Sequence, residues 1–119
     1  MYLSVVIPAY NEEKRIGESL TKTNDYLKKQ GYDFELIVVD DGSDDKTVDL
    51  LRTYSRKITN LVILENEINQ GKGYSVRNGI LASKGDIVLF TDADFSTPIE
   101  EVDKLLHWLE NGYQIAIGS

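Results

Sequence analysis

The nine residues Glu35-Leu36-Ile37-Val38-Val39-Asp40-Asp41-Gly42-Ser43 join a short apolar run to an abrupt polar end. A run of this length, rich in β-branched residues, is typical of a buried strand. Its polar end would stand between that strand and a helix, where a carboxylate can accept hydrogen bonds from a ribose hydroxyl or a base N–H and Gly42 lets backbone approach closely. Capping of the helix is the simpler reading for Asp44 and Asp45, whereas Asp41 lies before the cap.

Short apolar runs recur along the chain and alternate with longer amphipathic segments. The runs predicted as strands are residues 3–7, 35–39, 61–64, 87–90 and 115–117. Strict alternation of strand and helix implies parallel strands joined by right-handed crossovers. We therefore expect a three-layer, Rossmann-like α/β domain with a mainly parallel sheet, helices on both faces and a ligand crevice at the carboxyl ends of the strands.

Start and stop signals place four helices between these strands. Val48, Leu51 and Ile58 are expected to share one face of the second helix. The expected boundary residues are, in chain order, Asn11 and Gly31 for the first helix, Asp44 just before the second, Lys72 and Ser83 for the third, and Thr97 and Gly112 for the fourth.

Asp92-Ala93-Asp94 follows the apolar run 87–90 directly. Residues i and i+2 of an extended segment point the same way, so both carboxylates can face one hard cation such as Mg²⁺ or Mn²⁺, and a metal of this kind commonly accompanies a phosphate. Taken alone, the pattern is equally typical of a solvated turn. Gln70-Gly71-Lys72-Gly73, at the expected start of the third helix, fits a phosphate contact or a flexible loop about equally well, and it lacks the spacing of a Walker A motif.

Length and charge limit the classes of function. At 119 residues the chain is expected to be one domain, residues 1–119, and its net charge of −7 argues against a nucleic-acid partner. Cysteine is absent, which fits a reducing compartment. No run reaches the length of a transmembrane segment and none resembles a signal peptide, so the expectation for this chain is a cytoplasmic, soluble protein.

Four motifs, met in order, resemble the inverting nucleotide-sugar glycosyltransferases of family 2, which have the GT-A fold: residues 8–12 (PAYNE), 40–47 (DDGSDDKT), 71–73 (GKG) and 92–94 (DAD). Residues 71–80 make the chain most similar to the polyprenyl-phosphate branch, the dolichyl-phosphate glucose and mannose synthases. The resemblance implies Mg²⁺ or Mn²⁺ bound by Asp92 and Asp94, with Asp94 as the direct ligand. It also implies nucleotide-sugar contacts at Pro8, Ala9, Tyr10, Glu12, Val39, Asp40, Asp41, Lys72, Asp92 and Ala93.

The implied reaction is transfer of glucose or mannose from UDP-glucose or GDP-mannose to a polyprenyl phosphate. Members of the family continue into a second half that supplies the acceptor surface and usually a catalytic base. We therefore expect the base beyond residue 119, a membrane-associated parent protein with its active site facing the cytoplasm, and a 119-residue chain that binds donor weakly and is inactive alone. Three alternatives stay open here: a Mg²⁺-binding phospho-receiver module, a Rossmann dinucleotide binder, and a family 2 branch with a saccharide acceptor.

Overall fold

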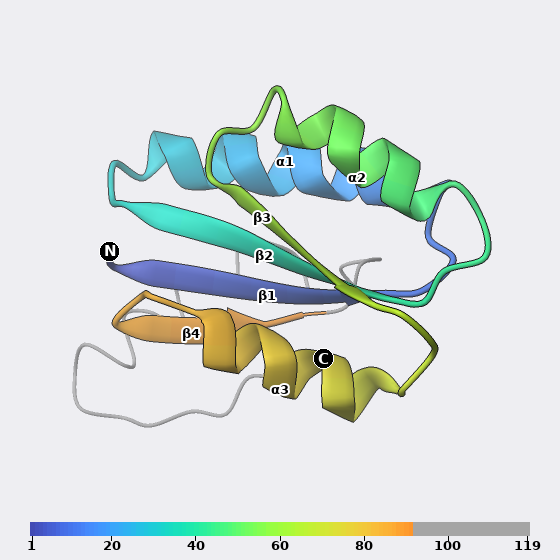
Figure 1. The fold of residues 1–119 in the computed structure, drawn as a ribbon. Helices are drawn as coiled ribbons and strands as arrows, with labels where there is room; N and C mark the ends of the chain where they lie inside the picture. Colours follow the sequence, from blue (N-terminus) through green and yellow to red (C-terminus); the bar gives the residue numbers. More distant parts are fainter. Residues whose placement is uncertain (92–119) are drawn as a thin grey trace.

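The computed structural model describes residues 1–91, which form one parallel sheet with a helix between each pair of consecutive strands. The strand order is β3-β2-β1-β4, so the chain first builds outward from β1 and then crosses to the other side of β1 (Figure 1). The elements are β1 (Leu3–Ala9), α1 (Ile16–Lys29), β2 (Phe34–Asp41), α2 (Thr47–Ser55), β3 (Leu61–Asn66), α3 (Lys72–Ala82) and β4 (Ile87–Phe90).

Helices cover both faces of the sheet, which confirms the predicted three-layer α/β arrangement. Helices α1 and α2 lie together over one face and α3 lies against the other (Figure 1). Alternate residues of β1 point to opposite faces, so Val5 and Ile7 join the core beneath α1 and α2, while Val6 packs on the α3 side. The central strands β1 and β2 are buried almost throughout, as expected for a parallel sheet covered on both faces.

The contact between α3 and the sheet depends on a glycine. A Cβ added to Gly79 would run into the side chain of Val6 and come within 3.2 Å of a methyl group of Val39. Helix α3 therefore approaches β1 and β2 closely with its smallest residues, since its only buried positions are Ser75 and Gly79. Among residues 1–91, no helix is long and apolar enough to cross a bilayer.

Four of the five predicted strands are confirmed, while the fifth strand and the fourth helix fall outside the described residues. The strands run further than predicted at their carboxyl ends: β1 continues through Ala9 and β2 through Asp41. Pro8 is tolerated inside β1 because the described pairing with β4 stops at Val6 and Phe90, with a last hydrogen bond from Thr91 N–H to Val6. The missing N–H of Pro8 therefore interrupts no ladder in this part of the chain.

Two helix starts were predicted wrongly. Helix α1 begins at Ile16 rather than after Asn11, which has a φ of 51° and makes no cap for this helix. Helix α2 begins at Thr47, and it ends before Ile58, which is buried beyond the helix. The stop at Gly31, with its φ of 82°, and the bounds of α3 agree with the prediction to within a residue or two.

Candidate functional site

The loops that follow β1, β2 and β3 gather at the carboxyl edge of the sheet (Figure 1). The first two loops are joined by hydrogen bonds between residues more than thirty positions apart. Asn11 N–H donates to Ser43 Oγ at 2.9 Å, and in return the N–H of Asp44 donates to Asn11 Oδ1 at 2.8 Å. The N–H of Glu12 donates to Thr47 Oγ1 at 2.9 Å. This reciprocal pairing explains why Asn11 and Asp44 are not ordinary helix caps, since their polar groups serve the neighbouring loop.

Asp45 contacts the residue at which α2 begins and the loop after β1. Its Oδ1 accepts the N–H of Thr47 at 2.9 Å and the Thr47 hydroxyl, while Oδ2 accepts the N–H of Glu13 at 3.3 Å. Burial alone would raise the pKa of the Asp45 carboxyl, but these hydrogen bonds outweigh it and hold the pKa below its ordinary value. The N-cap position of α2 is Lys46, which makes no side-chain cap hydrogen bond, so Asp45 holds the first helical residue from one position before the cap.

The carboxylate of Asp41 connects the end of β2 to the loop between β3 and α3. Its Oδ1 accepts the N–H of Gln70 at 2.7 Å and the side-chain amide of Asn66 at 2.9 Å, and its Oδ2 accepts the N–H of Gly71 at 2.9 Å. Burial would raise the Asp41 pKa, but these donors and the hydroxyl of Ser75 hold it below the ordinary value. Asp41 is thus an ionised, oriented carboxylate at the mouth of the sheet.

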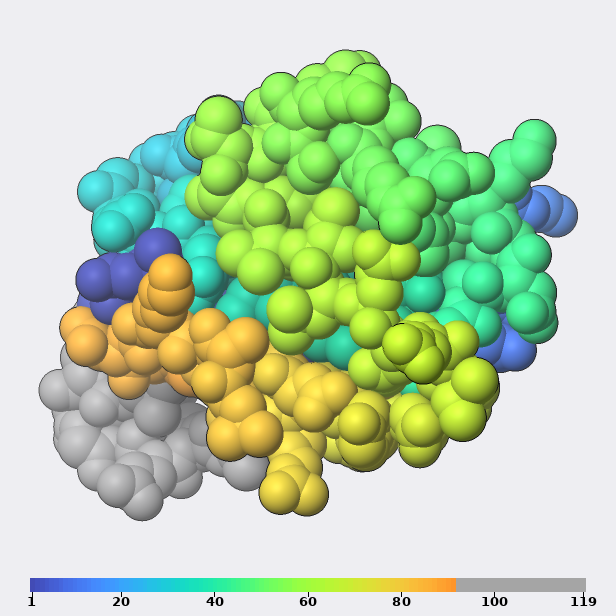
Figure 2. Space-filling view, viewed as in Figure 1, coloured from blue at the N-terminus to red at the C-terminus, as the bar shows by residue number. Residues whose placement is uncertain are grey.

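The loop that Asp41 holds lies directly on Gly42. A Cβ at this glycine would stand 2.7 Å from the backbone of Ile68 and Asn69, and Gly42 has a φ of 71°. The expected close approach at Gly42 is therefore made by the chain's own backbone. Figure 2 shows β3 and the loop that leads into α3 on the front of the molecule, with α2 above them and α3 below.

Asp40, Val39 and Ala9 contribute to the site mainly from inside the fold. Asp40 is 2% exposed and accepts the N–H of Ser43 at 3.2 Å and the Ser43 hydroxyl, so it shapes the turn after β2. The side chain of Val39 packs in the core on the α3 side and that of Ala9 packs in the core beneath α1 and α2. The side chains of all three residues are therefore buried rather than open to a ligand.

Tyr10, Glu12 and Lys72 offer side chains at the surface. Tyr10 is 42% exposed, and its hydroxyl lies 3.5 Å from Asp44 Oδ2. Glu12 forms an ion pair with Arg15 at 2.8 Å. Lys72 is exposed in the first turn of α3, directly after Gly71, whose φ of 98° sets the start of that helix. Pro8 is partly buried near the end of β1. The structure thus brings the candidate residues of β1, β2 and α3 to the carboxyl edge of the sheet.

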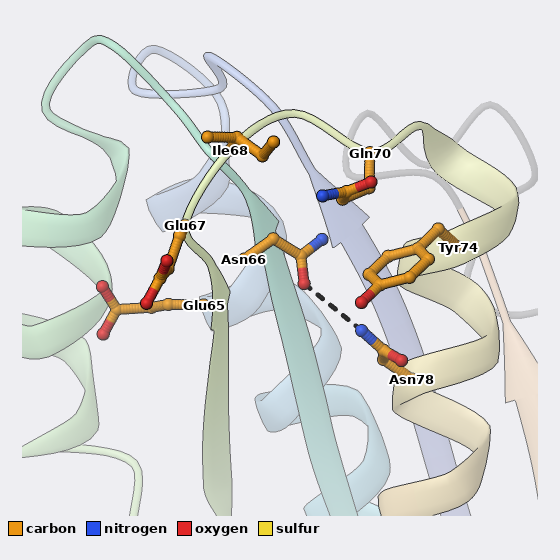
Figure 3. Close-up of a pocket in the computed structure, with 7 residues that line it drawn as sticks. All are labelled: Glu65, Asn66, Glu67, Ile68, Gln70, Tyr74 and Asn78. Carbon is orange, nitrogen blue, oxygen red and sulfur yellow. Dashed lines mark hydrogen bonds between the residues drawn. The ribbon is translucent and has the colours of Figure 1, made fainter.

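A pocket of about 430 Å³ lies beside this edge, between β3 and α3. Figure 3 shows the side chains of Asn66 and Asn78 turned toward one another across it, joined by a hydrogen bond of 3.3 Å, with the ring of Tyr74 alongside. The residues that line it are Glu65, Asn66, Glu67, Ile68, Gln70, Tyr74 and Asn78. Sequence reasoning missed Asn66, although Glu65-Asn66-Glu67 closes an apolar run just as Asp40-Asp41 does.

The predicted metal ligands Asp92 and Asp94, with Ala93 between them, lie outside the described residues. Strand β4 runs parallel to β1 and ends beside Val6, so the chain reaches residue 91 at the same edge as the three loops. Within residues 1–91, no group of three or more Asp, Glu or His side chains is arranged to hold a metal ion. The metal site stays a prediction that rests on residues 92–94.

Comparison with known proteins identifies the family. Residues 4–119 match the sequence profile of glycosyl transferase family 2. The chain belongs to this family. Relatives include the dolichyl-phosphate beta-glucosyltransferase ALG5A of Trichomonas vaginalis, 39% identical over 110 residues that make up 88% of this chain and 34% of the relative. The human dolichyl-phosphate beta-glucosyltransferase is also 39% identical, over 87% of this chain and 34% of its own length. The chain thus spans about a third of the length of these relatives.

Solved structures of family 2 enzymes share the fold. TarS of S. aureus, solved in one case in complex with UDP-GlcNAc, superposes with a TM-score of 0.73 at 33% identity over 93% of this chain and 32% of that one. The mannosyltransferase PcManGT of Pyrobaculum calidifontis, in complex with GDP-Man and Mn²⁺, gives a TM-score of 0.75 at 28% identity over 90% of this chain and 32% of that one. The GT-A fold expected from the motifs is confirmed.

The strand order also separates the alternatives. A phospho-receiver has the order 2-1-3-4-5, with β1 next to β3, whereas here β1 lies between β2 and β4. A Rossmann dinucleotide binder shares the order seen here, but it needs a glycine-rich turn after its first strand, and this family 2 chain has Pro8-Ala9-Tyr10 there.

Proposed function

We propose that this chain supplies the donor- and metal-binding part of an inverting glycosyltransferase that moves glucose from UDP-glucose to a polyprenyl phosphate. The observation that carries the proposal is the Asp41 carboxylate, held ionised at the edge where the loops after β1, β2 and β3 meet. An ionised carboxylate of this kind accepts hydrogen bonds from a base N–H or a ribose hydroxyl. Its Oδ2 accepts the N–H of Gly71, and a carboxylate oxygen can accept a further hydrogen bond from a ligand.

The base and ribose are assigned to the loops after β1 and β2. Tyr10 presents a half-exposed ring that can stack on a base, and Pro8 stiffens the end of β1 below it. Glu12 and Asp41 add acceptors on either side, while Ala9, Val39 and Asp40 support the turn from the core.

The diphosphate is assigned to the far side of β1, where β4 ends. Carboxylates of Asp92 and Asp94 are ligands that Mg²⁺ and Mn²⁺ prefer, and Ala93 would lie beside the sugar nucleotide between them. A bound divalent cation would neutralise charge on the nucleoside diphosphate as it leaves. Lys72 is assigned to the phosphates as a second positive charge, since it stands exposed at the start of α3.

The donor sugar and the acceptor follow from the relatives. Those that share 36–41% identity with this chain are named dolichyl-phosphate beta-glucosyltransferases in protists, insects and mammals. A polyprenyl phosphate is largely ionised near neutral pH, because the second pKa of a phosphate monoester is about 6. Such an acceptor makes little demand on a general base, so no residue of this chain is assigned a base role. We assign the acceptor surface and membrane association to the part of the relatives' length that this chain does not span.

Calorimetric titration of the chain with UDP and with GDP, each with and without Mn²⁺, tests the proposal. We expect UDP to bind more tightly than GDP, Mn²⁺ to strengthen binding about tenfold or more, and Asp94→Ala to remove the metal effect. Asp86→Ala, which deletes an exposed carboxylate at the other end of β4, is the matched control and should behave as wild type. Equal binding with and without Mn²⁺ would refute the metal assignment, and tighter binding of GDP would refute the donor assignment.

A further inference from the structure

Asn66, at the last position of β3, holds three other side chains at once. Its amide nitrogen donates to Asp41 Oδ1 at 2.9 Å and to Ser75 Oγ at 3.0 Å, and its carbonyl oxygen accepts from the amide of Asn78 at 3.3 Å. Both N–H bonds of the amide are therefore committed. These contacts connect the end of β3 with the end of β2 and with the first two turns of α3.

This arrangement fixes where the Asp41 carboxylate points. Backbone N–H groups of Gln70 and Gly71 hold it from the loop, and Asn66 and Ser75 hold it from the β3–α3 interface. Ser75 is fully buried, and its own N–H makes the first helical hydrogen bond of α3, to the carbonyl of Gly71. A single amide thus links the carboxylate proposed to bind donor with the start of the helix that carries Lys72.

We propose that Asn66 is a positioning residue for donor binding, which holds the Asp41 carboxylate in the orientation that meets the nucleoside. The inference rests on the proposed function, because it assigns the nucleoside contact to Asp41. Asn66 ends β3, the strand next to the one that ends with Asp41, and it acts on donor binding only through Asp41.

Replacement of Asn66 by aspartate removes the amide N–H that Asp41 accepts and sets a second carboxylate against it. The new carboxylate can still accept from Asn78, and the Ser75 hydroxyl, which donates to Asp41, has one hydrogen to share between the two carboxylates. Two carboxylates in contact repel while both are ionised and share a proton once the pH falls, which restores a hydrogen bond between them. The other charged side chains on the elements that meet here are Glu35 and Asp40 on β2, Glu65 on β3, Glu67 on the loop after it, and Lys72 and Arg77 on α3, and all stay unchanged.

The experiment measures UDP affinity of the 119-residue chain by calorimetry at about pH 8 and about pH 5. We expect Asn66→Asp to bind about tenfold or more weakly than wild type at the higher pH and to recover most of that loss at the lower pH. Gln70→Glu is the charge control: it adds the same negative charge on the adjoining loop but leaves the N–H that Gln70 donates to Asp41 intact. It should show no comparable recovery at low pH.

The outcomes distinguish the two levels of the argument. If wild type binds no UDP, the proposed function fails and the inference falls with it. If wild type binds UDP and Asn66→Asp matches Gln70→Glu at both pH values, the inference alone is overturned. Should Asn66→Asp not fold, as judged by circular dichroism, Ser75→Ala removes another donor from Asp41 without adding charge. We expect about threefold to tenfold weaker UDP binding from it, and wild-type affinity would contradict the positioning role.

Discussion

Replacement of Asp41 by asparagine should destabilise the chain strongly, even though the side chain keeps its shape. If the new oxygen takes the place of Oδ1, it can still accept from Gln70 and Asn66, but the new amide then faces the N–H of Gly71. A buried donor left unpaired costs about 1–3 kcal/mol, and the two remaining bonds weaken when the acceptor loses its charge, by about 0.5–1 kcal/mol each. We expect a loss of about 2–5 kcal/mol in the free energy of unfolding, a large share of the roughly 5–15 kcal/mol typical of a domain.

Urea unfolding followed by circular dichroism at neutral pH measures this loss. Asp33→Asn provides a matched control, because Asp33 is exposed at the opposite edge of the sheet and its backbone carbonyl, which the substitution leaves in place, accepts from Tyr2 and Leu3. The control should change the unfolding free energy by no more than about 0.5 kcal/mol. A loss of less than about 0.5 kcal/mol in Asp41→Asn would contradict the stabilising role of the hydrogen bonds that Asp41 accepts from Gln70, Asn66 and Gly71.

The pH dependence of the same difference checks its cause. Hydrogen bonds hold the pKa of Asp41 below its ordinary value of 3.8, so the folded state favours the ionised form. The stability that Asp41 contributes is then complete above the unfolded pKa and is lost as pH falls through the lower folded pKa. The gap between wild type and Asp41→Asn should stay constant from about pH 7 to about pH 5 and narrow below about pH 4. A gap that closes within the upper range would contradict the assignment.

Three further substitutions test the packing around the site by urea unfolding. Gly42→Ala should cost more than about 1 kcal/mol, because alanine is strained at a φ of 71° and its Cβ meets the backbone of Ile68; a neutral result would contradict this contact. Gly79→Ala should cost about 1–3 kcal/mol because the methyl group collides with Val6, and wild-type stability would mean that α3 packs less closely. Arg52→Ala removes an exposed ion pair with Glu65 and should change stability by less than about 0.5 kcal/mol.

The fold was predictable from the sequence because its strands are short, apolar and separated by clear helical segments. Local signals failed where the structure uses distant partners. Asn11 reads as a helix cap, yet it bonds with Ser43 and Asp44, more than thirty residues away, and no local pattern reveals that pairing. The chain before α1 is therefore committed to the loop after β2, and the helix begins later.

In the candidate site, too, the sequence indicates residues that carry a local signal but not those that depend on contacts between distant segments. The sequence singles out Asp41 because an acid that closes an apolar run and precedes the helix cap calls for an explanation beyond capping, and its part in donor binding stays a prediction. Asn66 was missed, although it closes a run of the same kind, because the polar cluster after the third run contains no paired acid and matches no motif. Its partners, Asp41 and Ser75, lie on different elements and meet it only after the sheet has formed.

The strand order sets how far apart the two ends of a donor must lie. The order in which strands are added to the sheet reverses at β1: β2 and β3 lie on one side of it and β4 on the other. In such a sheet the ligand crevice is expected between β1 and β4, at the edge where the proposed metal ligands follow residue 91. Asp41 stands on β2, which is two strand spacings, or about 10 Å, from β4. A ligand that engages both must therefore have two recognised ends joined by a short bridge. A nucleoside diphosphate meets that requirement with its base toward Asp41 and its diphosphate toward β4, whereas a free phosphate or a lone sugar would reach only one end.

Binding of UDP should consequently depend on both Asp41 and Asp94, while binding of UMP should depend on Asp41 and be nearly independent of Asp94 and of Mn²⁺. If UMP affinity falls equally in Asp41→Asn and in Asp94→Ala, the assignment of the base to Asp41 and of the diphosphate to Asp94 is wrong.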